Sequence, residues 1–246
     1  DEKEPQAIMY VWQFAIGQRA CYGRTMAEFL EFIAGLESYF KLDNTHKLII
    51  YVHNLSFEFQ FIRKYFQWVE VFSDSERHPI YCETPTLLFK CSYKLTNYSL
   101  AKVAEHLQHH SIKKLVGDLD YSLMRSPITP LTKEELGYCE NDVLIITAHI
   151  AECIQQEGGN ICDIPLTSTG YVRRYCRENT LNKYGYAGIN YKLMIRKLTL
   201  NNKMEYMLLH QAFMGGFTHA NAREVQCVNY NVKSFDFTSS YPAVMC

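Results

Sequence analysis

An unbroken apolar run between Lys47 and His53 is the sequence feature that most constrains the fold. The run ends in polar residues, which is typical of a strand that is buried on both faces of a sheet. Such a strand needs other layers of structure packed on each side of it. The sequence therefore predicts a central strand in an α/β domain.

The segments around this strand agree with that fold class. Thr25 with Glu28, and Thr132 with Glu135, form capping-box patterns, which mark the starts of helices. The second of these helices is long and is expected to end at residue 157, before two glycines. The other expected elements are a hairpin in 9–22, helices at 57–66 and 99–107, and strands at 68–72, 80–82 and 87–95. Together they predict a mixed sheet with flanking helices.

Composition narrows the class of protein. Hydrophobic residues make up 48% of the chain and charged residues 21%, which excludes a disordered chain. Nine scattered cysteines, an odd number, indicate reduced thiols in an intracellular protein. No apolar run is long enough to cross a membrane. The net charge of −1 means that any basic, nucleic-acid-binding surface must be local.

A change in composition after the long helix predicts two domains. Residues 158–170 contain Pro165 and several small polar residues, so we place the boundary between residues 165 and 166. Beyond it we expect a helix at 171–181 and strands at 225–237. The chain begins without Met and ends at Cys246 within an apolar stretch, so we expect a fragment of a longer protein.

Residues suited to chemistry first appear where the apolar strand ends. His53 and Asn54 follow the strand, and Glu58 comes at the start of the next helix. Sites in α/β sheets collect at the carboxyl ends of strands, and a carboxylate there can bind a divalent metal ion. A plainer interpretation is that Asn54 caps the helix and Glu58 complements its dipole. This motif by itself favours the plainer interpretation.

A second pair lies on the long helix. Tyr138 and Asp142 are four residues apart and therefore share one face. A phenol beside a carboxylate suits hydrolysis, with Asp142 binding a metal ion and Tyr138 orienting the attacking water. The alternative is a buried tyrosine whose hydroxyl has found a convenient acceptor. Taken alone, this pair favours the alternative of a buried tyrosine.

The third motif is residues 235–242. A strand brings Asp236 to its end, and a turn follows with Tyr241 and Pro242. Nucleotidyl transfer needs carboxylates that hold two metal ions about 3.5–4 Å apart, and backbone amides that bind the triphosphate. A tyrosine under the incoming sugar would exclude a 2′-hydroxyl group. An aspartate before an ordinary turn is the plainer alternative, but the company of the other motifs favours catalysis.

These segments occur in the order found in family B DNA polymerases. Residues 236–242 resemble motif A of that family, residues 53–58 its second exonuclease motif, and residues 138–142 its third. Residues 213–217 resemble the Tyr-x-Gly-Gly segment that joins the exonuclease and polymerase parts. Residues 117–121 resemble a stretch typical of the protein-primed branch of phages and linear plasmids. The resemblance spans most of the chain.

The resemblance implies two domains, one on each side of the boundary after residue 165. Residues 1–165 would form a ribonuclease H-like 3′→5′ exonuclease domain whose first motif lies upstream. Residues 166–246 would form a linker and the N-terminal part of the polymerase palm, through motif A. The implied function is template-directed DNA synthesis with proofreading in viral or plasmid DNA replication, and we expect this fragment alone to be inactive.

The resemblance also implies roles for exonuclease residues. Glu58 and Asp142 would bind the exonuclease metal ions, and Tyr138 would position the attacking water. The frayed primer end would contact the DNA-binding residues His53, Asn54, Phe57, Ser99 and Leu100.

In the polymerase half, Asp236 and the carbonyl of Phe237 would bind the metal ions. Each active site of the complete enzyme would use two ions, Mg²⁺ or Mn²⁺. The nucleotide would contact Phe237, Ser240 and Tyr241, and the DNA would contact Gly215, Gly216 and Ser239. The implied partners are primer-template DNA, single-stranded DNA, deoxynucleoside triphosphates and a terminal protein primer, with no membrane. We expect a cytoplasmic protein, in the host cell if a phage encodes it.

Several positions depart from the family pattern. Glu58 stands where the family has Asp, Phe213 replaces Tyr, and Ser240 replaces Leu. The family's lysine before the Gly-Asp stretch falls on Val116, with Lys113 and Lys114 close by.

Two other functions remain open. A stand-alone ribonuclease H-like exonuclease would explain Glu58, Tyr138 and Asp142 but not Asp236. A decayed module that only binds single-stranded DNA is supported by Glu58 in place of Asp.

Overall fold

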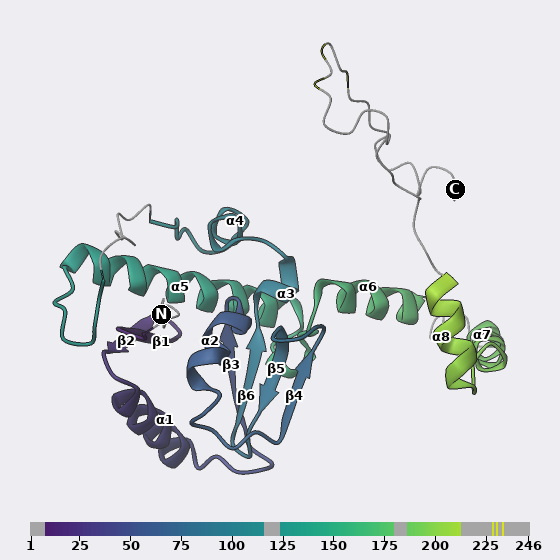
Figure 1. Ribbon diagram of the computed structural model, residues 1–246, viewed down its shortest axis with the longest axis horizontal. Helices are drawn as coiled ribbons and strands as arrows, with labels where there is room; N and C mark the ends of the chain where they lie inside the picture. The colour runs from purple at the N-terminus through teal and green to yellow at the C-terminus, as the bar shows by residue number, and fades with distance from the viewer. Residues whose placement is uncertain are drawn as a thin grey trace. The chain divides into compact units, whose positions relative to one another are not determined.

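The computed structural model describes residues 8–115, 124–179 and 186–212, together with Val228, Tyr230 and Lys233. The chain divides into two compact units, one of residues 1–185 and one of residues 186–246. The described part of the second unit contains the helices α7 (Tyr186–Lys197) and α8 (Lys203–Ala212) (Figure 1). All the described strands belong to the first unit. The functional boundary expected at residue 165 stays a prediction.

The first unit is built on a four-stranded mixed sheet with the strand order β3-β6-β5-β4. Strand β3 (Leu48–Val52) runs parallel to β6 (Leu87–Cys91). Strands β5 (Pro79–Glu83) and β4 (Glu70–Ser73) follow β6 as antiparallel neighbours. A separate hairpin pairs β1 (Trp12–Ile16) with β2 (Arg19–Gly23). Gly17 in its turn has a φ of 59°, a conformation that glycine adopts without steric cost.

The two longest helices of the first unit, α1 (Met26–Phe40) and α5 (Lys133–Gln156), begin at the positions that the sequence predicts. The other helices described in this unit are α2 (Leu55–Ile62), α3 (Tyr93–Thr96), α4 (Leu100–Glu105), the short 3₁₀ helix η1 (Ile161–Asp163) and α6 (Ser168–Arg177). Both capping boxes are confirmed, because Thr25 and Thr132 exchange hydrogen bonds with Glu28 and Glu135. Within the described ranges, no helix is long and apolar enough to span a bilayer.

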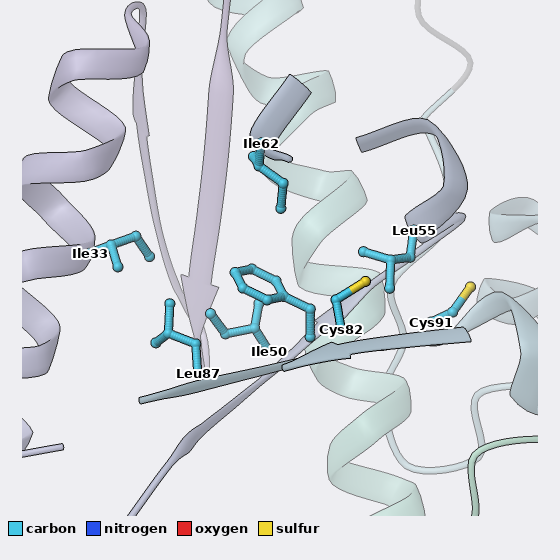
Figure 2. Close-up of a cluster of buried hydrophobic side chains, with 8 residues drawn as sticks. Ile33, Ile50, Leu55, Ile62, Cys82, Leu87 and Cys91 are labelled. Carbon is cyan, nitrogen blue, oxygen red and sulfur yellow. The ribbon is translucent and has the colours of Figure 1, made fainter. Parts of the chain in front are cut away.

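Apolar side chains fill the space on both faces of the sheet. On one face, Ile33 of α1 and Leu55 of α2 pack with Ile50 and Leu87 of the sheet (Figure 2). Burying a side chain of this size contributes about 1.5–3 kcal/mol to the free energy of unfolding. On the other face, a second cluster joins Tyr51 to α3, α5 and the segment around η1. The sheet is thus a middle layer between helices, and α2 and α5 lie on its opposite faces.

The predicted α/β class with a mixed sheet is confirmed, but the central position of β3 is not. In the described part of the chain β3 lies at an edge of the sheet, hydrogen-bonded only to β6. Its apolar sequence arises because helices cover both of its faces, with Ile50 facing one layer and Tyr51 the other. The strand expected at 87–95 ends at Cys91, before the turn into α3.

Candidate functional site

The junction between β3 and α2 carries four of the predicted site residues. His53 and Asn54 connect the strand to the helix, and Phe57 and Glu58 lie in the first turns of α2. Asn54 has a φ of 70°, in the left-handed region that asparagine tolerates. Its side chain makes no capping hydrogen bond. Asn54 therefore occupies the N-cap position of α2, as the plainer interpretation expected, but its side chain does not cap the helix.

Phe57 presents an aromatic surface beside this turn. Its side chain is 59% exposed. One part of the ring meets Phe61 in an edge-to-face contact, with 5.3 Å between the ring centroids. Exposed aromatic rings of this kind offer a stacking surface to the bases of a single strand. The position suits the DNA contact predicted for Phe57, which stays a prediction.

Glu58 differs from its neighbour because its carboxyl group is buried. Its Oε2 atom is out of contact with solvent and has no hydrogen-bond partner. Burial raises the pKa of Glu58 from 4.5 to about 7, although its own backbone amide has the opposite effect. An isolated buried carboxylate costs free energy unless a charge or a metal ion compensates it. This environment does not fit a surface glutamate that only complements a helix dipole.

Helix α5 brings a second carboxylate into a cluster with a lysine. Lys114 Nζ donates a hydrogen bond of 3.2 Å to Asp142 Oδ2 and lies 5.2 Å from the centroid of the Tyr138 ring. The other oxygen, Asp142 Oδ1, is buried without a partner. Burial raises the pKa of Asp142, even though the Lys114 ammonium lowers it. The cluster therefore consists of Tyr138, Asp142 and Lys114, and one oxygen of its carboxylate makes no hydrogen bond.

His53, at the end of β3, has its own partners on the neighbouring segment. Its Nδ1 atom lies 3.1 Å from Ser92 Oγ, and its ring packs edge-on against Tyr93. Burial lowers the pKa of His53, and the positive charges of His149 and Lys114 lower it further.

The structure does not join all the predicted metal ligands directly. Among the contacts of the described residues, none connects Glu58 to Asp142. The described ranges also contain no group of three or more His, Cys, Asp or Glu side chains arranged to hold a metal ion. The two carboxylates nevertheless fit a hard divalent cation, because each has one buried oxygen atom that makes no hydrogen bond. Their sharing of one cation stays a prediction.

Ser99 and Leu100 have local structural roles at the start of α4. The Ser99 hydroxyl accepts a hydrogen bond of 3.4 Å from the Lys102 amide and so caps the helix. Leu100 packs against the small cluster that joins α4 to Ile145 of α5. These contacts explain both residues without a ligand, and their predicted contact with DNA remains a prediction.

The residues predicted for the polymerase half lie outside the described residues. They are Gly215, Gly216, Asp236, Phe237, Ser239, Ser240 and Tyr241. The family-like stretch at 117–121 lies outside them as well.

Lys114 is the site residue that sequence comparison alone could not select. The family lysine aligns with Val116, and both Lys113 and Lys114 lie within three residues of that position. The structure distinguishes them, because the Lys114 ammonium contacts Asp142 whereas the Lys113 side chain is exposed. Lys113 contributes only its backbone carbonyl, which accepts a hydrogen bond of 2.9 Å from the Asn141 amide.

The raised pKa of Glu58 predicts a pH-dependent stability. Between pH 4.5 and about 7 the folded state holds a proton that the unfolded state releases, so the free energy of unfolding falls as pH rises through this range. The full effect is about 3 kcal/mol for a shift of this size. Urea unfolding at pH 5 and pH 8 with EDTA would measure it.

Glu58→Gln isolates this contribution. The variant is expected to lose most of the difference in stability between the two pH values, because it cannot ionise. Glu31→Gln on the exposed part of α1 is the matched control and is expected to retain the difference. Identical pH dependence in the parent and Glu58→Gln would show that the Glu58 carboxyl group does not titrate as its burial predicts.

A comparison with known families gives a match over the second part of the chain. The model of a family described as DNA polymerase type B, organellar and viral, matches residues 117–246, which is more than half of the chain. No curated protein matches the sequence.

Comparison with solved structures finds Phi29 DNA polymerase in several states. Its orthorhombic crystal form has a TM-score of 0.54 at 17% identity, and the match covers 74% of this chain and 33% of the Phi29 polymerase chain. The complex with single-stranded DNA has a TM-score of 0.52 at 16% identity and covers 71% and 32%. The ternary complex with primer-template DNA and incoming nucleotide has a TM-score of 0.51 at 20% identity and covers 83% and 35%.

At these identities the structural likeness shows a shared fold. It agrees with the mixed sheet and flanking helices of the first unit. The chain spans about a third of the length of the solved structures that it matches.

Proposed function

The chain belongs to the type B DNA polymerases of organelles and viruses, and on that premise we propose that its first unit is a 3′→5′ proofreading exonuclease domain. One observation carries the proposal. Glu58 Oε2 and Asp142 Oδ1 are buried carboxylate oxygens that no hydrogen bond satisfies. Buried polar atoms without partners are rare in folded proteins, and a bound ion is one of the explanations for them. Of the three such side-chain atoms in the described residues, two are these carboxylate oxygens and the third is the Tyr51 hydroxyl.

The reaction proposed for this site is hydrolysis of the last phosphodiester of a single DNA strand. The oxygen of a water molecule forms a bond to phosphorus, and the bond from phosphorus to the 3′-oxygen of the preceding nucleotide breaks. That oxygen takes up a proton, and a nucleoside 5′-monophosphate is released. A divalent cation, Mg²⁺ or Mn²⁺, with Glu58 and Asp142 as ligands would supply charge stabilisation for the developing phosphate charge.

The remaining side chains would bind and orient the reactants. The Tyr138 hydroxyl would orient the attacking water, and the Lys114 ammonium beside it would stabilise negative charge on the phosphate. Asn54, with no capping bond, and exposed Phe57 would hold the terminal nucleotide. His53 would contact the strand as an uncharged hydrogen-bonding group, since its pKa is lowered.

For the second half of the chain we propose the start of a polymerase active site. The family model matches residues 117–246, a range that includes the segment 236–242, which resembles motif A. Asp236 and the Phe237 carbonyl would bind the polymerase metal ions, and Ser240 and Tyr241 would contact the nucleotide. Gly215, Gly216 and Ser239 would contact the DNA. A terminal protein would serve as the primer, as the sequence at 117–121 suggests.

A degradation assay tests the exonuclease proposal. The intact gene product is incubated with a 5′-labelled single-stranded oligonucleotide and Mg²⁺ or Mn²⁺. The expected result is a ladder shortened from the 3′ end, release of nucleoside 5′-monophosphates and complete inhibition by EDTA. Binding of the oligonucleotide without any shortening would contradict the proposal and support a module that only binds DNA.

Lys114 gives a second prediction for the same assay. Lys114→Met is expected to slow degradation by about 10- to 100-fold, the usual cost of removing a side chain that orients a metal ligand. Lys113→Met is the matched control, one residue away with an exposed side chain, and is expected to keep the parent rate. Equal rates for the parent and Lys114→Met would remove Lys114 from the site.

A further inference from the structure

A cleft lies on the face of the sheet opposite α1 and α2. Tyr81 pairs with Lys90 and Glu83 pairs with Leu88 across β5 and β6, so these four side chains lie on one face. Cys82, between Tyr81 and Glu83, points to the other face and into the core of Figure 2. The four residues form the floor of the cleft.

The wall of the cleft comes from the segment of η1 and from α6. Arg173, Arg174 and Arg177 line it. The cleft has a volume of about 710 Å³. Sites for small molecules and cofactors have volumes of roughly 300–1,000 Å³, so this cleft has the size of a ligand site.

The unpaired charge in the cleft is positive. Lys90 is only 8% exposed, and its ammonium lies 5.9 Å from the centroid of the Tyr51 ring but makes no hydrogen bond or ion pair with any residue that the structure describes. Arg173 and Arg177 are four residues apart and share one face of α6. The fourth cation is already engaged, because Arg174 binds the Glu157 carboxylate and the Asp163 carbonyl.

The acidic groups of the lining are also engaged. Glu83 forms an ion pair with Lys47, and the Asp163 carboxylate accepts a hydrogen bond of 3.0 Å from the Asn160 amide. The cleft thus offers an incoming anion Lys90, Arg173 and Arg177 without a competing free carboxylate at the floor. The Lys90 side chain is largely buried and its ammonium has no carboxylate partner among the described residues, so a bound anion would form a charge-assisted hydrogen bond that no other group competes for.

The burial of Lys90 favours a terminal phosphate over a nucleic-acid backbone. A backbone phosphate carries sugars on two sides and follows the surface, whereas a phosphomonoester can enter a cleft and reach its floor. Tyr81 adds an aromatic group beside Lys90, and its ring stacks on Phe72 with 5.5 Å between centroids. Aromatic rings stack on nucleobases without regard to sequence.

We propose that this cleft binds a nucleoside 5′-phosphate. Its phosphate lies between Lys90 and the pair Arg173 and Arg177, and its base lies beside Tyr81. The site is separate from the carboxylates of the exonuclease proposal and does not depend on their activity.

Calorimetric titration of the intact gene product with dAMP, in EDTA, tests the proposal. Lys90→Met keeps the length of the side chain and removes a buried charge, so it is expected to fold at least as stably as the parent. It is expected to bind dAMP about tenfold or more weakly, the effect of losing one charge-assisted hydrogen bond. The double variant Arg173→Gln/Arg177→Gln is expected to weaken binding by a similar factor, and exposed Arg63→Gln is the matched control.

Three further titrations test whether dAMP binds in this cleft or at the exonuclease site, and whether the cleft prefers another ligand. Asp142→Asn is expected to bind dAMP as the parent does, and loss of binding in that variant would assign dAMP to the exonuclease site. Inorganic phosphate is expected to bind more weakly than dAMP, and equal affinity would overturn the nucleoside part of the proposal. Stronger binding of an oligonucleotide without a terminal phosphate, sensitive to Lys90→Met, would overturn it in favour of a strand-binding cleft. Absence of dAMP binding at millimolar concentration would refute it.

Discussion

Asp142→Asn is expected to reduce 3′→5′ degradation of single-stranded DNA by about three orders of magnitude. Asparagine has nearly the same shape as aspartate but carries no negative charge and is a weak ligand for a hard cation. Losing several kcal/mol of charge stabilisation in the transition state corresponds to a rate loss of this size. The rate of release of nucleoside 5′-monophosphates at saturating Mg²⁺ would measure it.

The control for this variant must separate chemistry from folding. The substitution leaves the Lys114 ammonium without its charged partner, so some loss of stability is expected as well. Thermal unfolding would show whether the variant remains folded at the assay temperature. Asp74→Asn, which removes an exposed carboxylate paired with Lys94, is expected to keep the parent rate. A folded Asp142→Asn protein with more than a tenth of the parent activity would exclude Asp142 as a metal ligand.

Asp236→Asn is expected to abolish DNA synthesis while leaving 3′→5′ degradation intact. Asp236 stands in the segment that resembles motif A, where a carboxylate is needed to hold the metal ions of nucleotidyl transfer. The expected loss is again about three orders of magnitude, because the same kind of charge stabilisation is removed. Primer extension and degradation assays on one preparation of the intact gene product would measure both rates.

The reverse pattern is expected for Asp142→Asn, which would lose degradation and keep synthesis. Each variant thus serves as the control for the other. Unchanged DNA synthesis by Asp236→Asn would remove the polymerase assignment and leave a stand-alone exonuclease. Loss of both activities in either variant would mean that the two predicted sites are not independent.

Features set by neighbouring residues could be predicted from the sequence. The capping boxes at Thr25 and Thr132 depend on residues three positions apart, and the structure confirms both. The hairpin of β1 and β2 and the long helix α5 follow from equally local patterns. The mixed sheet was also predictable, because alternating helices and apolar strands have few ways to pack.

Features set by contacts between distant segments could not be predicted. The place of β3 at the sheet edge depends on which strands pair with it, and its apolar composition says only that both of its faces are covered. The contact of Lys114 with Asp142 joins residues 28 positions apart, so no local pattern could choose between Lys113 and Lys114. The burial of Lys90 has the same origin, because the segment that covers it lies far along the chain.

Sharing of one divalent cation by Glu58 and Asp142 is the claim on which the exonuclease account rests. Electron paramagnetic resonance of Mn²⁺ can count bound ions in the Asp236→Asn background, which removes the other predicted metal site. The account predicts that Glu58→Gln and Asp142→Asn each weaken binding of the same ion, and that the double variant loses that shared ion. Mn²⁺ binding that neither substitution changes would contradict it.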